Sequence, residues 1–303
     1  MSRIVLLFTF FGILLASSAH SPLFGQLMPF ESNAPKPQFD PQEKKKKSIK
    51  KNPLSNKSFA QLKEGKTKAL EKKDLPSALK HLDAMRIACT DNRKNNDHEA
   101  IKDILLEMGQ LYVQLEDWTK GEKAYSEFIL LYPSAAQCDF AHYQAIVCGF
   151  NLTLTPDRDQ TKTQEVIDRA SKFVIEYPKS SHLPQVTTLL TQAREKLLES
   201  EIGIFNFHLH SKHYKAAQLK IESITQEHIT YLPAQEPKAL ELTIQLAQAQ
   251  NNQREQLKAQ LALGQKFPEH EITKKLVTDL PAIEIQLASL EPKLLGHPST
   301  GSG

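Results

Sequence analysis

Residues 105–133 read LLEMGQLYVQLEDWTKGEKAYSEFILLYP, and they hold the most regular pattern in the chain. The residues that form this pattern fall on fixed positions of a grid of about 34 residues. They are Leu105, Met108, Gly109, Tyr112, Trp118, Gly121, Tyr125, Phe128 and Pro133. Two antiparallel helices explain the spacing, because small residues stand where the helices approach closely and large residues fill the gaps. Proline then ends the second helix, so the stretch predicts a helix–turn–helix unit.

This grid is that of the tetratricopeptide repeat (TPR), and the flanking sequence follows it more loosely. A first unit has Lys66 at the grid position of the small residue, with Asp74 as the N-cap of its second helix. A third unit begins at Asp139 and carries nine extra residues between its helices. Its second helix is expected to open with a capping box formed by Thr161 and Gln164.

Further helix pairs follow towards the C-terminus. A fourth unit has a long first helix over residues 184–210, and a degraded fifth unit covers residues 236–268. A final helix over residues 271–290, interrupted by Pro281, is expected to cover the last apolar face. Only 11 of the 303 residues are glycine, which also favours helices. We therefore predict an all-α chain, a TPR superhelix of about five helix–turn–helix repeats plus a C-terminal capping helix.

Four segments are expected along the chain. Residues 1–19 contain Arg3, an apolar run too short to span a bilayer, and a Ser-Ser-Ala end, which is typical of a signal peptide cleaved before His20. Residues 20–56 hold six prolines and a lysine run, and therefore predict a disordered linker. Residues 57–291 are assigned to the superhelix and residues 292–303 to a flexible tail.

The charge is nearly balanced, with 38 Lys and Arg against 35 Asp and Glu, which argues against a nucleic-acid-binding protein. The basic excess is concentrated in the linker, while the rest of the chain is mildly acidic. The lysine cluster between Lys44 and Lys51 is either a solvated linker or a peripheral contact with an anionic membrane or an acidic partner.

The sequence contains none of the usual catalytic motifs: no phosphate-binding Gly-x-x-x-x-Gly-Lys loop, no Gly-x-Ser-x-Gly turn and no His-Glu-x-x-His helix. The nearest approach to a metal cluster is His208, His210 and His213, but residues two apart on a helix face different ways. We therefore expect no catalysis, no cofactor, no metal and no small-molecule substrate.

The three cysteines are Cys89, Cys138 and Cys148. If Cys138 and Cys148 share a helix, they lie about 15 Å apart, too far for a disulfide. We expect all three to be small buried residues, although a bridge to Cys89 stays open.

Several of these residues resemble the signature of the BamD (ComL, YfiO) family, over roughly residues 57–270. The resemblance rests on the insertion and on the end of the helix that follows it: Asp157, Arg158, Asp159, Gln160, Thr161, Tyr177, Pro178 and Ser180. Asp139-Phe140-x-x-Tyr143 is similar to another helix of the family. Family members typically carry a lipidated cysteine after the signal sequence, but the chain has no cysteine before Cys89.

The resemblance implies a noncatalytic, exported adaptor at the periplasmic face of the outer membrane, acting in β-barrel assembly. It implies two kinds of partner, a BamA-like barrel protein with POTRA domains and unfolded outer-membrane proteins. The BamA-like partner is expected to dock at the C-terminal repeats, on Arg194, Glu201, Tyr214 and Lys220. The alternative for each of them is a structural role, such as bracing neighbouring helices. A general periplasmic TPR scaffold in envelope division, secretion or peptidoglycan-linked processes is the alternative.

The unfolded substrates are expected in a groove on the concave face of the first three repeats. The TPR grid places on that face Lys63, Leu70, Leu106, Gln110, Val113, His142, Ile146 and Phe150. Apolar groups beside amide and basic groups suit a peptide that ends in an aromatic residue and a carboxylate.

Overall fold

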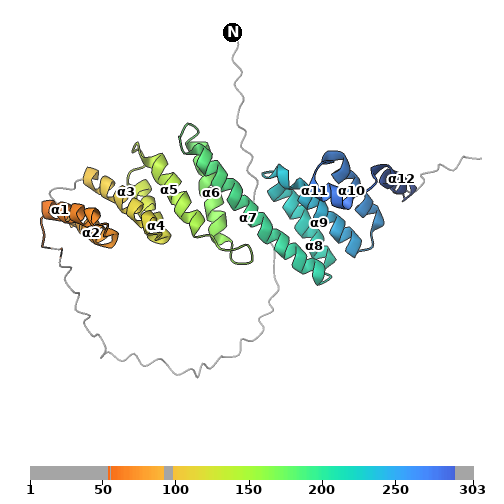
Figure 1. Cartoon of the computed structure of the whole chain (residues 1–303), viewed down its shortest axis with the longest axis horizontal. Helices are drawn as coiled ribbons and strands as arrows, with labels where there is room; N and C mark the ends of the chain where they lie inside the picture. Colours follow the sequence, from red (N-terminus) through yellow and green to blue (C-terminus); the bar gives the residue numbers. More distant parts are fainter. Residues whose placement is uncertain (1–53, 55, 92–97, 291–303) are drawn as a thin grey trace, which may run out of the picture. The chain divides into compact units, whose positions relative to one another are not determined.

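The computed structural model describes residues 54, 56–91 and 98–290 (Figure 1). The predicted signal peptide, nearly all of the predicted linker and the predicted tail lie outside these residues. All regular structure in the described part is helical. The helices are α1 (Phe59–Glu71), α2 (Leu75–Asp91), α3 (His98–Gln114), α4 (Trp118–Leu131), α5 (Cys138–Asn151), α6 (Thr161–Glu176), α7 (Leu183–His210), α8 (Tyr214–Ser223), α9 (Glu236–Ala249), α10 (Gln253–Lys266), α11 (Glu271–Leu276) and α12 (Leu280–Leu290). A π-helix, η1 (Ile224–Ile229), extends α8, and a short 3₁₀ turn, η2 (Pro233–Gln235), precedes α9.

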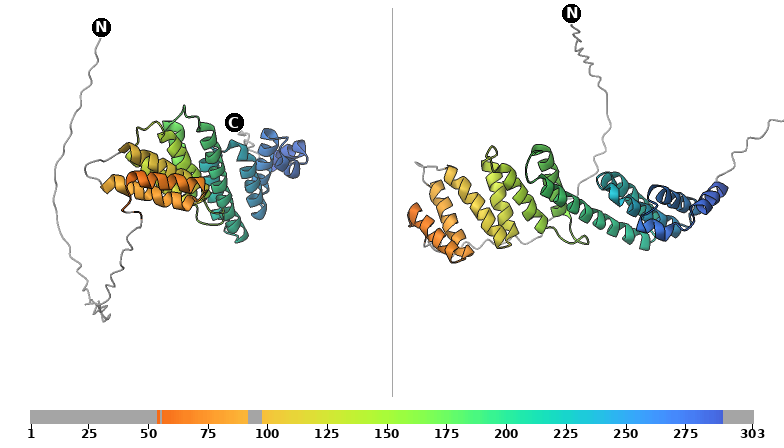
Figure 2. Two further views of the ribbon diagram at one scale, coloured as in Figure 1. Left: turned by 60° about the vertical axis from the view of Figure 1, so that its left-hand side comes forward. Right: turned by 45° about the horizontal axis from the view of Figure 1, so that its top comes forward.

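Consecutive helices pack as antiparallel pairs. The pairs are α1 with α2, α3 with α4, α5 with α6, α7 with α8 and α9 with α10, and each pair contacts the next (Figures 1 and 2). The prediction of an all-α TPR fold is thus confirmed. The predicted N-cap is also present, because Asp74 Oδ1 accepts the Ser77 N–H at 3.1 Å.

The close approaches within pairs explain the glycines of the grid. A Cβ added at Gly109 would lie 2.6 Å from the buried ring of Tyr125 on the partner helix. In the first pair the small residue at the close approach of the two helices is Gly65, which lies against the His81 ring. The grid predicts Lys66 at this position. Lys66 instead reaches α3, where its Nζ lies 2.7 Å from a carboxylate oxygen of Glu107.

Two predicted helix boundaries are wrong. The N-cap residue of α6 is Gln160, and its side chain forms no capping hydrogen bond. Asp159 Oδ1 accepts both the N–H and the hydroxyl of Thr161. The predicted Thr161–Gln164 capping box therefore does not form. The C-terminal helix breaks after Leu276 rather than at Pro281. Asp279 accepts the Ala282 N–H at 3.1 Å, and Pro281 lies in the first turn of α12, where its missing N–H costs nothing.

Helix α7 joins two parts of the core. Its first half buries one stripe against α5 and α6, formed by Val186, Leu190, Ala193 and the partly buried Leu197. Its second half buries another stripe against α8, η1 and α9, formed by Leu198, Ile202, Phe205 and Leu209. The second series begins one residue after the first ends, which turns the buried face by about 100°.

Candidate functional site

The loop between α5 and α6, residues 152–160, carries part of the family signature and is called the signature loop below. Its second half forms hydrogen bonds within the molecule. The Gln160 side-chain amide donates to the carbonyl oxygens of Thr155 and Arg158, at 2.7 and 3.0 Å. Its carbonyl accepts the hydroxyl of the fully buried Thr163 at 2.7 Å. With the Asp159–Thr161 bonds, these contacts close the loop over the start of α6. Asp159, Gln160 and Thr161 are therefore structural residues.

Tyr177 and Ser180 fasten the end of α6 to the start of α5. The Ser180 hydroxyl donates to Asp139 at 2.7 Å, and the Tyr177 hydroxyl lies 3.6 Å from the Cys138 sulfur. The ring of Tyr177 also packs against His142, at 5.3 Å between centroids. Burial, followed by the bond to Cys138, raises the pKa of Tyr177 to about 12. Pro178 follows the end of α6 and is exposed.

The structure brings three of the four predicted docking residues towards one pocket. Arg194 stacks on the ring of Tyr231, with 4.3 Å between the guanidinium carbon and the ring centroid. Lys220 of α8 bonds to Glu201 of α7. Tyr214 does not share this environment, because it packs partly buried against the core of α7 to α9.

The pocket beside these residues has a volume of about 420 Å³ and lies between α6, α7 and η1. Arg194 and Glu201 line it together with Asp168, Glu227 and His228. Burial lowers the pKa of His228, although the neighbouring carboxylates of Glu201 and Glu227 oppose the shift. The imidazole therefore enters the pocket as a neutral group at neutral pH.

The predicted groove residues differ in exposure. Lys63 and Gln110 are exposed, and a further five are partly buried: Leu70, Leu106, Val113, His142 and Phe150. The assignment of Ile146 to the groove surface is wrong, since it is only 1% exposed and packs against α6 and α7. Burial lowers the pKa of His142, whose ring faces Tyr177.

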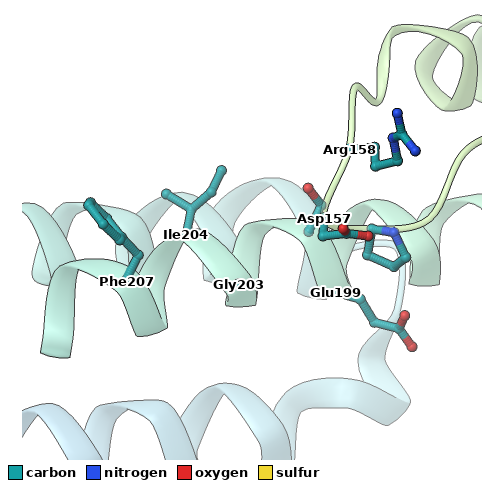
Figure 3. A pocket seen from close by; sticks show the side chains of 8 residues that line it. Asp157, Arg158, Glu199, Gly203, Ile204 and Phe207 are labelled. Atoms are coloured by element: carbon teal, nitrogen blue, oxygen red, sulfur yellow. The ribbon is translucent and has the colours of Figure 1, made fainter.

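A larger pocket, about 540 Å³, was not anticipated from the sequence (Figure 3). Its floor is the second half of α7, with Glu199, Gly203, Ile204 and Phe207, and one end is formed by the exposed part of the signature loop, Pro156 to Arg158. Figure 3 shows Ile204 and Phe207 along α7, away from Asp157 and Arg158 on the loop. The sequence does contain a signal for it, namely a glycine and exposed apolar residues outside both buried stripes of α7.

The described residues contain no group of three or more His, Cys, Asp or Glu side chains placed to hold a metal ion. Cys138 and Cys148 are free and buried, and both lie on α5. Cys89 is buried as well. Among the described helices, none combines the length and the apolar character needed to cross a bilayer.

A family model described as YfiO, outer membrane lipoprotein, matches residues 56–262. This range runs from the start of the first helix pair into α10, and it includes the signature loop and all four docking residues. The chain belongs to the YfiO family. The resemblance to BamD proteins found in the sequence is thereby confirmed.

A curated relative of this family member is the outer membrane protein assembly factor BamD of Caulobacter vibrioides. It is 23% identical over 103 residues, and the alignment spans 34% of each chain, about a third of the relative's length. Among solved structures, a tetratricopeptide repeat protein from Parabacteroides merdae is 12% identical, with a TM-score of 0.32 over 76% of this chain and 97% of that one. The assembly chaperone of RpL4, Acl4, is 16% identical, with a TM-score of 0.30 over 77% and 83%. TM-scores this low carry no argument about function.

Proposed function

We propose that this YfiO family member is a noncatalytic periplasmic adaptor of the machinery that assembles β-barrel proteins in the outer membrane. The observation that carries the proposal is the family match over residues 56–262. Paired helices with open faces suit this work, because a TPR array presents side chains of its first helices to peptides and partner proteins. The adaptor is held at the inner face of the outer membrane through its partners, with the lysines between Lys44 and Lys51 adding a peripheral contact with anionic lipid.

The periplasmic part of a BamA-like protein docks at Arg194 in this proposal. Stacking on Tyr231 holds the guanidinium in one orientation while its N–H groups stay available for a carboxylate. The Lys220–Glu201 pair braces α7 against α8 beside it. A preorganised arginine of this kind is typical of the centre of a protein interface.

Unfolded barrel proteins bind the first three repeats in the same proposal. Lys63 and Gln110 supply polar contacts, and the partly buried apolar residues between them supply the surface for an aromatic side chain. A peptide with a free carboxylate at its end would be favoured, since Lys63 has no resolved ion pair among the described residues.

The docking proposal is tested by measuring the affinity of the full mature chain for the periplasmic domain of the BamA-like protein from the same organism. Arg194→Glu is expected to weaken binding at least about tenfold, because it places a carboxylate where a cation is required. Lys215→Glu is the matched control, as it reverses an exposed lysine of α8 with no ion pair among the described residues. Equal loss in both variants, or no binding by the unaltered chain, would favour a general TPR scaffold instead.

The peptide proposal is tested separately by fluorescence anisotropy with the last ten or so residues of a barrel protein. Binding should weaken when the peptide is amidated at its C-terminus and when Lys63 is changed to Glu. Lys80→Glu, on the second helix of the same pair, should leave it unchanged. A peptide that binds both variants equally well would remove this groove from the proposal.

A further inference from the structure

We infer that the pocket between the signature loop and α7 is a second docking site, which accepts a basic amphipathic helix from another protein. It lies on a different face of α7 from Arg194 and Glu201, because helical spacing puts residues 199, 203 and 207 on one side and residues 194, 197 and 201 on another. The inference therefore does not rest on the BamA-like partner proposed above.

Gly203 is the first observation. The structure describes five other glycines in its helices, and at each of them an added Cβ would lie within 3.1 Å of a neighbouring side chain. At Gly203 no atom of the described residues lies within 4 Å of that position. A glycine inside a helix lowers its stability by about 1 kcal/mol relative to alanine, and internal packing does not require this one. Its place in the pocket floor points to an approach from outside.

The surroundings of Gly203 indicate what approaches. Ser200, one turn earlier, is also small, so the two leave a flat strip of helix backbone on which a second helix can cross closely. Ile204 is 40% exposed and Phe207 is 65% exposed at the edge of this strip. An apolar groove of this kind accepts the apolar face of an amphipathic helix, whose anchoring side chains are spaced at i, i+3 and i+4.

Charge narrows the choice of occupant. Two carboxylates, Asp157 and Glu199, line the pocket with one basic group, Arg158, so the lining is acidic on balance. Neither carboxylate forms an ion pair with any described residue. A hydrogen bond from Thr155 lowers the pKa of Asp157, which keeps it ionised. The complementary partner therefore carries a lysine or arginine within about a turn of the apolar side chain that covers Gly203.

The other candidates fit less well. The lining is acidic on balance, with two carboxylates against Arg158, so it would repel anionic lipid, and a second copy crossing at Gly203 would bring two such acidic linings together. The chain's own basic segment, residues 42–52 (QEKKKKSIKKN), contains no proline, but its only apolar residue is Ile49, so it cannot present the apolar face of an amphipathic helix.

The test uses the full chain in its native cells, with the photo-crosslinking residue p-benzoylphenylalanine at position 207. We expect an adduct with a helical segment of another protein that has Lys or Arg within four residues of the crosslinked site. Gly203→Trp should reduce the yield at least about tenfold by filling the pocket, whereas Gly203→Ala should retain it. The same crosslinker at Ile175, exposed on α6, should not produce this adduct.

A charge exchange completes the test and stands in for Gly203→Trp if that variant is misfolded by circular dichroism. Glu199→Lys should lower the yield, and changing the identified basic residue of the partner to Glu should restore it. Adducts confined to lipid, to a second copy, to residues 20–53 or to a segment without a basic residue would overturn the inference. So would the absence of an adduct, or a yield that none of these substitutions changes.

Discussion

The glycines within the helices differ in whether a neighbouring side chain fills the space that a Cβ would take. Gly109 lies under the fully buried ring of Tyr125, so its missing side chain is explained by its own helix pair. Gly203 faces open space. The two residues have the same helical environment but opposite packing, and alanine distinguishes them.

Gly203→Ala is expected to raise the free energy of unfolding by about 1 kcal/mol, because alanine favours the helix and meets no neighbour. Gly109→Ala should lower it, since the new methyl group would lie 2.6 Å from the Tyr125 ring and overpacking costs about 1–3 kcal/mol. Urea denaturation of both variants measures the difference. A loss of stability in Gly203→Ala would show that the pocket floor is packed in solution.

His81 contributes a pH dependence. Its Nδ1 is buried without a hydrogen-bond partner among the described residues, and burial, then the charge of Lys57, lowers its pKa. The unfolded chain therefore binds this proton more readily, so stability is lost as the pH falls from about 6.5 towards the lower folded pKa.

His81→Phe should reduce the loss of stability between pH 7.5 and pH 5, because phenylalanine cannot take up the proton. Thermal unfolding of both proteins at the two pH values provides the measurement. His142 and His228 remain in both and cancel in the comparison, although burial lowers their pKa values too. Identical pH profiles would rule out a contribution from His81.

At the scale of the elements, one turn is reused. Four of the described residues that are not glycine have a positive φ, between 55° and 59°: Lys73, Glu116, Lys212 and Asn251. Each directly precedes the N-cap residue of the second helix in its pair. The third pair has the signature loop at this place instead. Of the four, only asparagine favours the left-handed region, so the sequence did not indicate the shared turn.

Ion pairs connect the second helices of successive units. Glu122 of α4 is 13% exposed and accepts Lys162 and Arg169 of α6, both at 2.8 Å. Glu122→Gln should destabilise the chain by about 1–3 kcal/mol, because the partly buried Lys162 and the more exposed Arg169 both lose the carboxylate that they share. Glu64→Gln, which removes an exposed pair within α1, should have no measurable effect. Denaturant midpoints that shift equally would contradict this role for Glu122.

For the whole molecule, α7 is the element that matters most, because its two buried stripes belong to different clusters of the core. In a repeat array each unit is stabilised mainly by its neighbours. Damage to one stripe should therefore remain on its own side of α7.

Phe205→Ala tests this division. It removes a fully buried ring from the second stripe, a change that typically costs about 3–5 kcal/mol. Hydrogen exchange should become faster in α8, η1 and α9, while the amides of α1 to α4 keep their rates. Uniform acceleration along the chain would mean that the described repeats unfold as a single cooperative unit.

The sequence alone determined the class of fold, the helix pairs and the family, because these depend on local periodicity and on residue types at fixed spacing. The family resemblance grouped Arg194, Glu201 and Lys220 with Tyr214, and the structure brings the first three towards one pocket while Tyr214 packs against the core. The sequence failed at Ile146 and Lys66, since a shift of one residue on a helix changes the buried face by about 100°. It failed at the Thr161 cap because Asp159 accepts the Thr161 N–H and hydroxyl.

Only the tertiary structure decided which residues of the signature brace the fold and which are left exposed. Asp159, Gln160 and Ser180 are consumed by internal hydrogen bonds, while Asp157 and Arg158 line a pocket with α7. The bonds of Asp159 and Gln160 are local, but the Ser180–Asp139 bond and the pocket join segments some 40 residues apart, and these depend on how the pairs stack. Periodicity along a helix identifies its apolar face, but the neighbour that covers that face, or leaves Gly203 open, is set by long-range packing.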